Sequence, residues 1–584
     1  MKKLLLSALV GLAMFSCKPS ENKELNKLFE DYYEERLSYF PLEATSQGDY
    51  RFNDQLPIDI SEDYRRNLLN FYQTYNDRLD KFDQNELTED EKIYYNALKF
   101  NLTTESEALS YPTHLQPFNQ FVGLPLTIAQ YGSGESAQPF KTAQDYDNWL
   151  KRFDKFVIWA DTAIANFDKG IKAENVLPAA LVKKMIPQMR ELATGEPTAH
   201  LFYGPVKKIP AGLDAAQKAA ITAKYTAAIE TKVKPTYKKL ADYLQNTYLP
   251  KARSSSGILS IKNGINHYKF LTYYWTTSLK STDEIMQIGL SEVNRIRKEM
   301  EKIRVQVGFK GDLNAFLASV RNDPKLMPYK TPEEVLAAFK NIQTKMEPNL
   351  KKMFNLTPKT KFEIRRTEAF REASASAEYI QGTADGSRPG IFYVPIPDAT
   401  KFNVTSGMES LFLHEAIPGH HYQVSLQQEN LNIPKFLRFG WYGAYGEGWA
   451  LYCESLGKDL GLYTDPYQYL GALGDEIHRA IRLVVDTGMH TKGWTREQAL
   501  QYMLDNEAIS VEGATAEIER YMAYPGQALS YKIGAMKIRE LRGKYMTEMG
   551  DKFSMAAFHD EVLKHGCLPL SILEEKLDAW AKIK

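Results

Sequence analysis

Helix-start signals recur along the whole chain and favour a mainly helical fold. In a capping box, a Ser or Thr side chain accepts a hydrogen bond from the third amide of a helix, and a Glu or Gln at that third position reaches back. The pattern occurs in four places: Thr88 with Glu91, Ser281 with Glu284, Thr331 with Glu334, and Thr495 with Gln498. After Ser281, apolar residues recur every three to five positions as far as Ile303, which predicts a long amphipathic helix.

The stretch from Ala377 to Pro397 has a different pattern. Two short β-favouring runs, Tyr379-Ile380 and Ile391 to Val394, lie on either side of Asp385-Gly386, which is typical of a hairpin. This stretch comes directly before a segment rich in histidine. We therefore expect a mainly α protein with a small β hairpin or sheet beside that segment.

Composition excludes one class of partner and gives no reason to divide the chain. The 73 basic residues balance the 73 acidic ones, so no net positive field attracts nucleic acid. No repeat, low-complexity block or long linker interrupts the sequence, and we expect one helical body at 25–584 with its motif-bearing core at 377–535. The chain has only 3 cysteines, too few for a disulfide framework; whether Cys453 and Cys567 pair is left open.

The first residues read as an export signal. Two lysines precede an apolar run from Leu4 to Phe15, which is too short to span a bilayer, since spanning takes about 20 residues. We expect a signal peptide at 1–16. The small residue before Cys17 resembles a bacterial lipobox, so Cys17 is the expected lipidation site and residues 17–24 the tether. The expected location is the bacterial cell envelope, with the protein lipid-anchored and facing the periplasm or the cell surface.

Metal-binding residue types are densest in LFLHEAIPGHHYQ (411–423). In an H-E-x-x-H helix, two histidines share one face and the glutamate beside them acts as general base. Here Pro418 stands in place of the second histidine and cannot bind a metal. On an unbroken helix, His420 would lie about 9 Å along the axis from His414, and His421 about 10.5 Å. A bulge at the proline that absorbs two residues would return His420 to the ligand position, and one that absorbs three would return His421; the first is favoured.

A third ligand is expected in GAYGEGWALYCE (443–454). Catalytic zinc needs three protein ligands and an open position, and Glu447 follows at a distance that allows a turn and a second helix. Glu454 lies two turns further along the same face. That placement suits a carboxylate that orients a ligand histidine.

Together these motifs resemble the domain of unknown function 885 family, many of whose members are envelope lipoproteins. The resemblance is carried by HEAIPGHHYQ (414–423), EGWALYCE (447–454), DGSRPG (385–390), DTGMH (486–490) with Gly493-Trp494, and YPGQA (524–528) with Tyr531. The family is similar to the mostly helical zinc carboxypeptidases and to the neurolysin-like oligopeptidases. The resemblance therefore implies a large helical zincin-like metallopeptidase fold with a deep cleft.

The resemblance also implies a role for each motif. It implies Zn²⁺ as cofactor, with His414, His420 and Glu447 as ligands and Glu415 as general base. Tyr524 or Tyr531 is expected to donate to the oxyanion, and Arg388 or Arg520 to hold a substrate carboxylate. The strand that contains Tyr393 is expected to pair with an extended peptide. The groups expected to orient a ligand or to replace one are His421, Glu454 and His490.

Three functions are compatible with these residues. The leading expectation is a zinc-dependent peptidase that cleaves a peptide or small amide substrate. A zinc hydrolase of a non-peptide amide or ester would share every metal ligand. A non-catalytic envelope binding protein is the third, but Glu415 counts against it, because a structural zinc site usually closes with four protein ligands and needs no base.

Overall fold

The expected helix starts are largely present in the computed structural model of the chain, which describes residues 21–368, 372, 376–405 and 407–583. Complete capping boxes start α4 (Glu89–Ala108), α12 (Thr282–Gln306) and α20 (Arg496–Asn506). At α14 (Pro332–Met353), Thr331 caps the helix, but the Glu334 carboxylate accepts a hydrogen bond from the Lys330 amide at 2.6 Å and the box is not completed.

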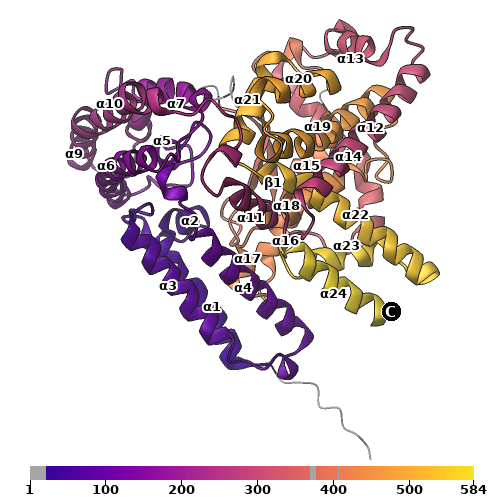
Figure 1. Cartoon of the computed structure of the whole chain (residues 1–584), viewed down its shortest axis with the longest axis horizontal. Helices are drawn as coiled ribbons and strands as arrows, with labels where there is room; N and C mark the ends of the chain where they lie inside the picture. The colour runs from indigo at the N-terminus through magenta and orange to yellow at the C-terminus, as the bar shows by residue number, and fades with distance from the viewer. Residues whose placement is uncertain (1–20, 369–371, 373–375, 406, 584) are drawn as a thin grey trace, which may run out of the picture.

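Two groups of helices make up the N-terminal part (Figure 1). The first comprises α1 (Lys23–Tyr39), α2 (Pro41–Ser46), α3 (Glu62–Leu79) and α4. The second comprises α5 (Leu124–Gly132), α6 (Ala143–Lys172), α7 (Ala179–Glu191), α8 (Gly204–Lys207), α9 (Ala215–Ala228) and α10 (Lys234–Tyr243). The expected signal peptide and Cys17 lie outside the described residues. Because α1 begins at Lys23, the last two residues of the expected tether are helical.

The remaining helices form the C-terminal part, which contains the histidine-rich segment (Figure 1). Before it come α11 (Gly264–Thr276), α12, α13 (Leu313–Arg321) and α14. The segment itself forms α15 (Met408–Glu415) and α16 (His420–Glu429). After it come α17 (Lys435–Arg438), α18 (Gly443–Glu454), α19 (Pro466–Thr491), α20, α21 (Val511–Ala523), α22 (Ser530–Met549), α23 (Met555–Leu563) and α24 (Leu570–Ile583).

A three-stranded sheet lies among these helices, in the order β1-β3-β2. The predicted hairpin is present as β2 (Glu378–Ile380) paired antiparallel with β3 (Gly390–Val394). β1 (Phe362–Arg366), which was not predicted, pairs parallel with the other edge of β3. Phe392 is buried against Phe339 of α14, so this face of the sheet packs on the core. The neighbours Ile391 and Tyr393 face the other way and line a pocket.

The buried side chains form two large hydrophobic clusters that α12 and α19 both join. In α12, Ile285 belongs to one cluster and Val293 to the other. α18 and α22 cross with almost no side chain between them, because Gly448 of α18 faces Gly534 of α22 and a Cβ on Gly534 would overlap the carbonyl oxygen of Ala444. This crossing fixes α18, which carries Glu447.

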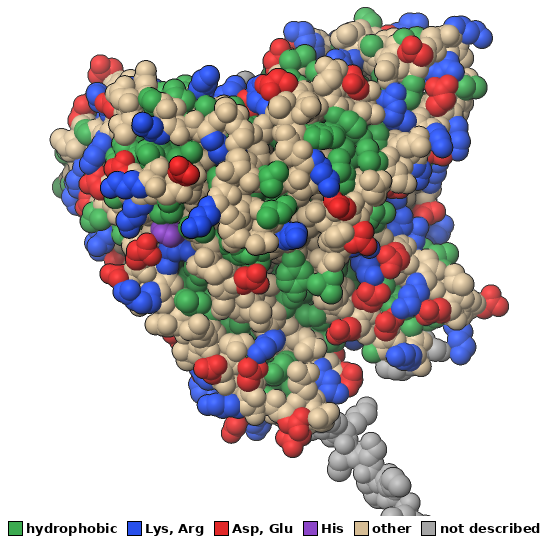
Figure 2. All heavy atoms as spheres, in the orientation of Figure 1, with side chains coloured by type: hydrophobic (Ala, Val, Ile, Leu, Met, Phe, Trp, Pro, Cys, Tyr) green, Lys and Arg blue, Asp and Glu red, His purple; other side chains and the backbone are tan. Residues whose placement is uncertain are grey.

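The surface shows no large region of one charge on the face drawn in Figure 2, where basic and acidic side chains are interspersed. Cys453 and Cys567 are buried and free, so the two do not form a disulfide. Among the helices that the structure describes, none is both long and apolar enough to cross a bilayer.

Candidate metal centre

A break in the helix places the second histidine. α15 ends at Glu415 and α16 begins at His420, where the sequence predicted a bulge in one continuous helix. The backbone turns so tightly that a Cβ on Gly419 would overlap the carbonyl oxygen of His414, which only glycine avoids. The indole Nε1 of Trp449 donates a hydrogen bond to the Pro418 carbonyl oxygen at 2.8 Å. The turn is therefore fastened to α18, the helix that supplies the third candidate ligand.

The turn brings His414, His420 and Glu447 together, as the sequence predicted. Their candidate ligand atoms all lie within 4.8 Å of one another. Glu447 Oε2 lies 3.6 Å from His414 Nε2 and 3.4 Å from His420 Nε2. The two imidazole rings are nearly perpendicular, at 89°.

This donor set fits zinc. Nitrogen and oxygen ligands bind zinc at about 2.1 Å in tetrahedral geometry, so two ligand atoms of one ion lie about 3.4 Å apart. Both nitrogen-to-oxygen separations are close to that value. Two imidazoles and a carboxylate are also a ligand set used by catalytic zinc sites, which leave the fourth position open.

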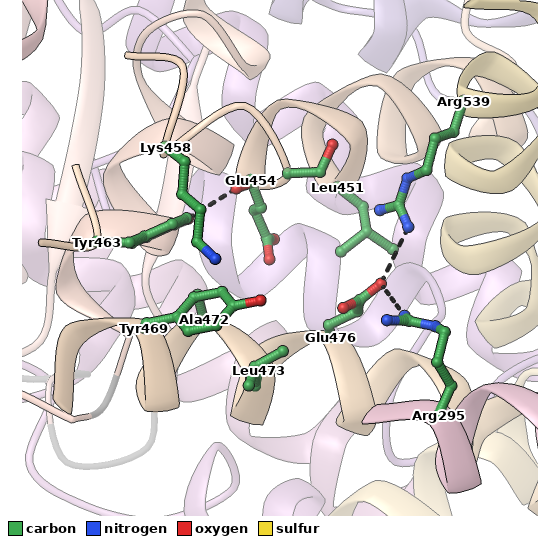
Figure 3. A pocket seen from close by; sticks show the side chains of 11 residues that line it. Arg295, Leu451, Glu454, Lys458, Tyr463, Tyr469, Ala472, Leu473, Glu476 and Arg539 are labelled. Atoms are coloured by element: carbon green, nitrogen blue, oxygen red, sulfur yellow. Dashed lines mark hydrogen bonds and ion pairs between the residues drawn. The ribbon is translucent and has the colours of Figure 1, made fainter. Parts of the chain in front are cut away.

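Glu454 orients His414. Its Oε1 lies 2.8 Å from His414 Nδ1, which directs Nε2 of the same ring toward Glu447. A carboxylate behind a metal-binding histidine fixes the ring and raises its basicity. Glu454 also lines a small pocket of about 180 Å³ between α18 and α19, where it lies near Lys458 and Tyr463 (Figure 3).

The candidate metal centre contains several ionisable side chains although it is buried. Burial opposes the charged form of His414, but Glu447 and Glu454 raise its pKa to about 10. Burial likewise opposes ionisation of Glu447, yet hydrogen bonds from His414 and His420 hold its pKa well below the usual range. Burial raises the pKa of Glu415, and both histidines oppose that rise. The ionised Glu447 carboxylate beside two imidazoles thus supplies negative charge where a divalent cation would bind.

A pocket of about 920 Å³ opens onto this centre. His420, Glu447 and Trp441 form one part of its lining, and the outward face of the sheet and α5 form others. The Trp441 ring lies 5.8 Å from the His420 ring. Arg388 and Tyr393 line the same pocket, which we call the cleft.

The strand expected to bind a peptide is not available for pairing. β3, which contains Tyr393, has β1 on one edge and β2 on the other, so its backbone groups are already in the sheet. A peptide added as a strand needs an unpaired edge. Because β3 is central, the expectation that it pairs with substrate is wrong; Tyr393 instead faces the cleft.

The late tyrosines form a group with Arg520. Arg520 donates hydrogen bonds to Tyr531 at 3.3 Å and to Gln527 at 3.1 Å. Tyr524 packs against Trp275 and Phe121. Within the described part of the chain, none of these three predicted site residues bonds to the candidate ligands.

Two other predicted residues lie elsewhere. His421 is buried beside Tyr379 and Ser425, at 3.2 and 3.3 Å, and burial lowers its pKa to about 4. His490 accepts from the Ile258 amide at 3.1 Å and lies 3.1 Å from the Tyr521 carbonyl oxygen. Neither is part of the three-residue cluster. Both histidines connect segments of the fold, and so do not take the ligand-orienting places that the sequence predicted.

One charged residue near the centre was not predicted from the sequence. Arg479 of α19 interacts electrostatically with Glu415, Glu454 and Tyr531. Its Nε atom is buried without a hydrogen-bond partner among the described residues. An arginine in the middle of a helix has no sequence signal of its own, and only the packing of α19 against α15 brings it here.

Comparison with known proteins agrees with the fold and gives the chain a family. A candidate lipoprotein from Colwellia psychrerythraea has a crystal structure with a TM-score of 0.90 to this one, at 28% identity over 96% of this chain and 99% of that chain. A candidate lipoprotein of unknown function from Shewanella oneidensis has the same fold, with a TM-score of 0.72 at 20% identity over 95% and 99%. No curated protein matches the chain. The family model described as "Bacterial protein of unknown function (DUF885)" matches residues 41–577, and the chain therefore belongs to that family.

Proposed function

We propose that this protein is a zinc-dependent hydrolase with a zincin-like metallopeptidase fold, and that its substrates are peptides. The observation that carries the proposal is the grouping of His414, His420 and Glu447 at ligand spacing, with His420 and Glu447 in the lining of the cleft. A cleft of about 920 Å³ has room for several residues of an extended substrate.

The chain's own residues have distinct tasks in this proposal. Bound zinc supplies a Lewis acid that polarises a carbonyl and makes water acidic. His414 and His420 offer Nε2, and Glu447 offers a carboxylate oxygen, while Glu454 holds the His414 ring in place. Glu415 accepts a proton from water and passes it to the leaving amine. The outward face of the sheet and α5 line other parts of the cleft in which the substrate would lie.

The test is mass spectrometry of a mixed peptide pool incubated with zinc-loaded protein that lacks residues 1–20. We expect shortened peptides from the wild type, and a fall in rate of about 10²- to 10⁴-fold in Glu415→Gln with zinc content unchanged. His414→Ala is expected to lose zinc. Glu497→Gln, at an exposed carboxylate with 73% of its side chain accessible, is the matched control.

Two results would count against the proposal. An untouched pool in the presence of stoichiometric zinc would exclude a peptidase and favour a hydrolase of another amide or ester. An unchanged rate in Glu415→Gln would remove Glu415 as the base.

We further propose that the protein is held at the cell envelope by a lipid on Cys17. The support is the lipobox-like sequence before Cys17 and the description of both structural relatives as candidate lipoproteins. Cys17→Ser is expected to move the protein from the membrane fraction to the soluble fraction and to abolish incorporation of labelled palmitate. Membrane association that survives the substitution would contradict the anchor.

A further inference from the structure

The cleft contains a cation that has no counter-ion among the described residues. Arg388 lines the cleft together with His420 and Glu447. It makes no ion pair with any carboxylate in the described part of the chain, and its Nε atom is buried without a hydrogen-bond partner there. A guanidinium partly removed from water without a counter-ion is costly, because the charge loses hydration and gains nothing in return. A ligand anion would supply the missing partner.

The loop between β2 and β3 holds the backbone of Arg388 in place. The Arg388 amide donates to the Thr383 hydroxyl at 3.0 Å, and the Arg388 carbonyl oxygen accepts from the Thr383 amide at 3.1 Å. The nearby Asp385 carboxylate is engaged within the loop, where it accepts from the Ser387 amide at 3.0 Å. The loop therefore fixes the start of the Arg388 side chain and keeps its own carboxylate occupied.

A short path connects Arg388 to the candidate ligands. Gly390, two residues further on, lies so close to Tyr379 and His421 that a Cβ there would approach His421 Nδ1 to 2.9 Å. Tyr379 bonds to His421 at 3.2 Å, and His421 is the direct neighbour of His420. The end of the loop thus packs on the first turn of α16, the turn that carries a candidate ligand.

The other arginine expected to bind substrate is already neutralised. Arg520 lies 3.5 Å from the Glu517 carboxylate and also bonds to Gln527 and Tyr531. Arg520 is also not part of the cleft lining. The structure therefore favours Arg388 over Arg520 as the anion-binding residue.

The acidic groups of the cleft have other partners. Glu135 forms an ion pair with Lys208, and Glu447 belongs to the metal centre. Glu368 and Glu378 also have partners of their own. A substrate carboxylate at Arg388 therefore meets one unpaired positive charge and no unpaired negative one among these residues.

We propose that Arg388 binds the α-carboxylate of the last residue of a peptide, so that the enzyme removes residues from the carboxyl end. This inference rests on the proposed function. The planar guanidinium matches a carboxylate in a two-point hydrogen bond. In the reaction, the last peptide C–N bond breaks, water gives its hydroxyl to the acyl carbon and a proton to the leaving nitrogen, and a free amino acid and a shorter peptide result.

The test compares one peptide in three forms: unmodified, amidated at the carboxyl end, and acetylated at the amino end. We expect the unmodified and acetylated forms to be hydrolysed alike, and the amidated form to lose at least about 30-fold in kcat/KM. In Arg388→Gln, the unmodified peptide should fall to the level of the amidated one, and Arg388→Lys should restore part of the difference. Arg66→Gln, at an exposed arginine of α3 paired with Asp63, is the control.

Binding without turnover gives a second measurement. In Glu415→Gln, which should keep zinc, calorimetry is expected to show tighter binding of the unmodified peptide than of the amidated one, and Arg388→Gln in that background should remove the difference.

Equal hydrolysis of all three forms would overturn the role of Arg388 and leave the proposed function standing. Rejection of the acetylated form alone would also overturn it, in favour of recognition of an amino terminus. No hydrolysis of any form, with zinc bound, would overturn both proposals.

Discussion

Single residues at the candidate metal centre have separable roles. His414 contacts one carboxylate through each ring nitrogen, Glu447 at 3.6 Å and Glu454 at 2.8 Å. Glu447 offers a candidate ligand atom, and Glu454 sets the orientation of the His414 ring. The sequence spacing indicated this division, because Glu447 and Glu454 lie two turns apart on one helix face. It did not indicate Arg479 or Trp441, whose positions depend on how distant segments pack.

The role of Glu454 predicts a change in metal affinity. Glu454→Gln should weaken zinc binding about 10- to 100-fold, because the amide is a poorer acceptor for the His414 N–H group. Competition with a chromophoric chelator measures this. Glu540→Gln, at a carboxylate with 58% of its side chain exposed, should leave the affinity unchanged. Equal affinities in the two variants would show that Glu454 does not support the ligand.

At the scale of elements, the break between α15 and α16 determines the site. Sequence reasoning recognised that Pro418 requires an irregularity, since it removes an amide from the helix. Whether the chain would bulge or break could not be predicted, because the outcome depends on the Trp449 indole, which is contributed by α18. The hairpin was predicted for a similar local reason, and β1 was not, because nothing in a five-residue strand indicates which distant strand it will pair with.

The break also predicts that Gly419 does not tolerate substitution. Gly419→Ala should displace His420, since the added methyl group overlaps the His414 carbonyl oxygen, and overpacking of this kind costs about 1–3 kcal/mol. We expect lower thermal stability together with loss of zinc. Gly543→Ala on α22 is the matched control, because a Cβ there meets open space and should be neutral or slightly stabilising. Full zinc occupancy in Gly419→Ala would refute the need for this close turn.

At the scale of the whole molecule, buried polar residues connect helices that are far apart in the sequence. Asp486 of α19 accepts hydrogen bonds from Tyr268 of α11 and from the Gly526 amide, at 3.1 Å for the latter. The mainly helical fold followed from capping and periodicity, which are local signals. The two hydrophobic clusters could not be predicted from these local signals, because they combine segments hundreds of residues apart in the chain.

Asp486 predicts a pH dependence of stability. Burial raises its pKa from 3.8 to about 7, with Tyr268 and Gly526 opposing the rise. Between pH 4 and 7 the carboxyl of the unfolded chain has lost its proton, while that of the folded chain keeps it. The free energy of unfolding therefore falls as pH rises through this range, by up to about 4 kcal/mol in total. Above pH 7 this contribution no longer changes. The melting temperature of wild type minus that of Asp486→Asn should decline from pH 5 to 7 and then flatten. A difference that does not vary with pH would contradict the raised pKa.

A small pocket beside α18 reaches the candidate metal centre from a direction other than the cleft. Glu454 lines this pocket (Figure 3). The same side chain holds His414, and the pocket shares no lining residue with the cleft. Under the proposed function, a compound that fills it and donates a hydrogen bond to the Glu454 carboxylate would loosen His414 without competing with substrate. Under the proposed function, this pocket offers inhibitor design a non-competitive route, in which selectivity would depend on Lys458 and Tyr463 and not on the metal.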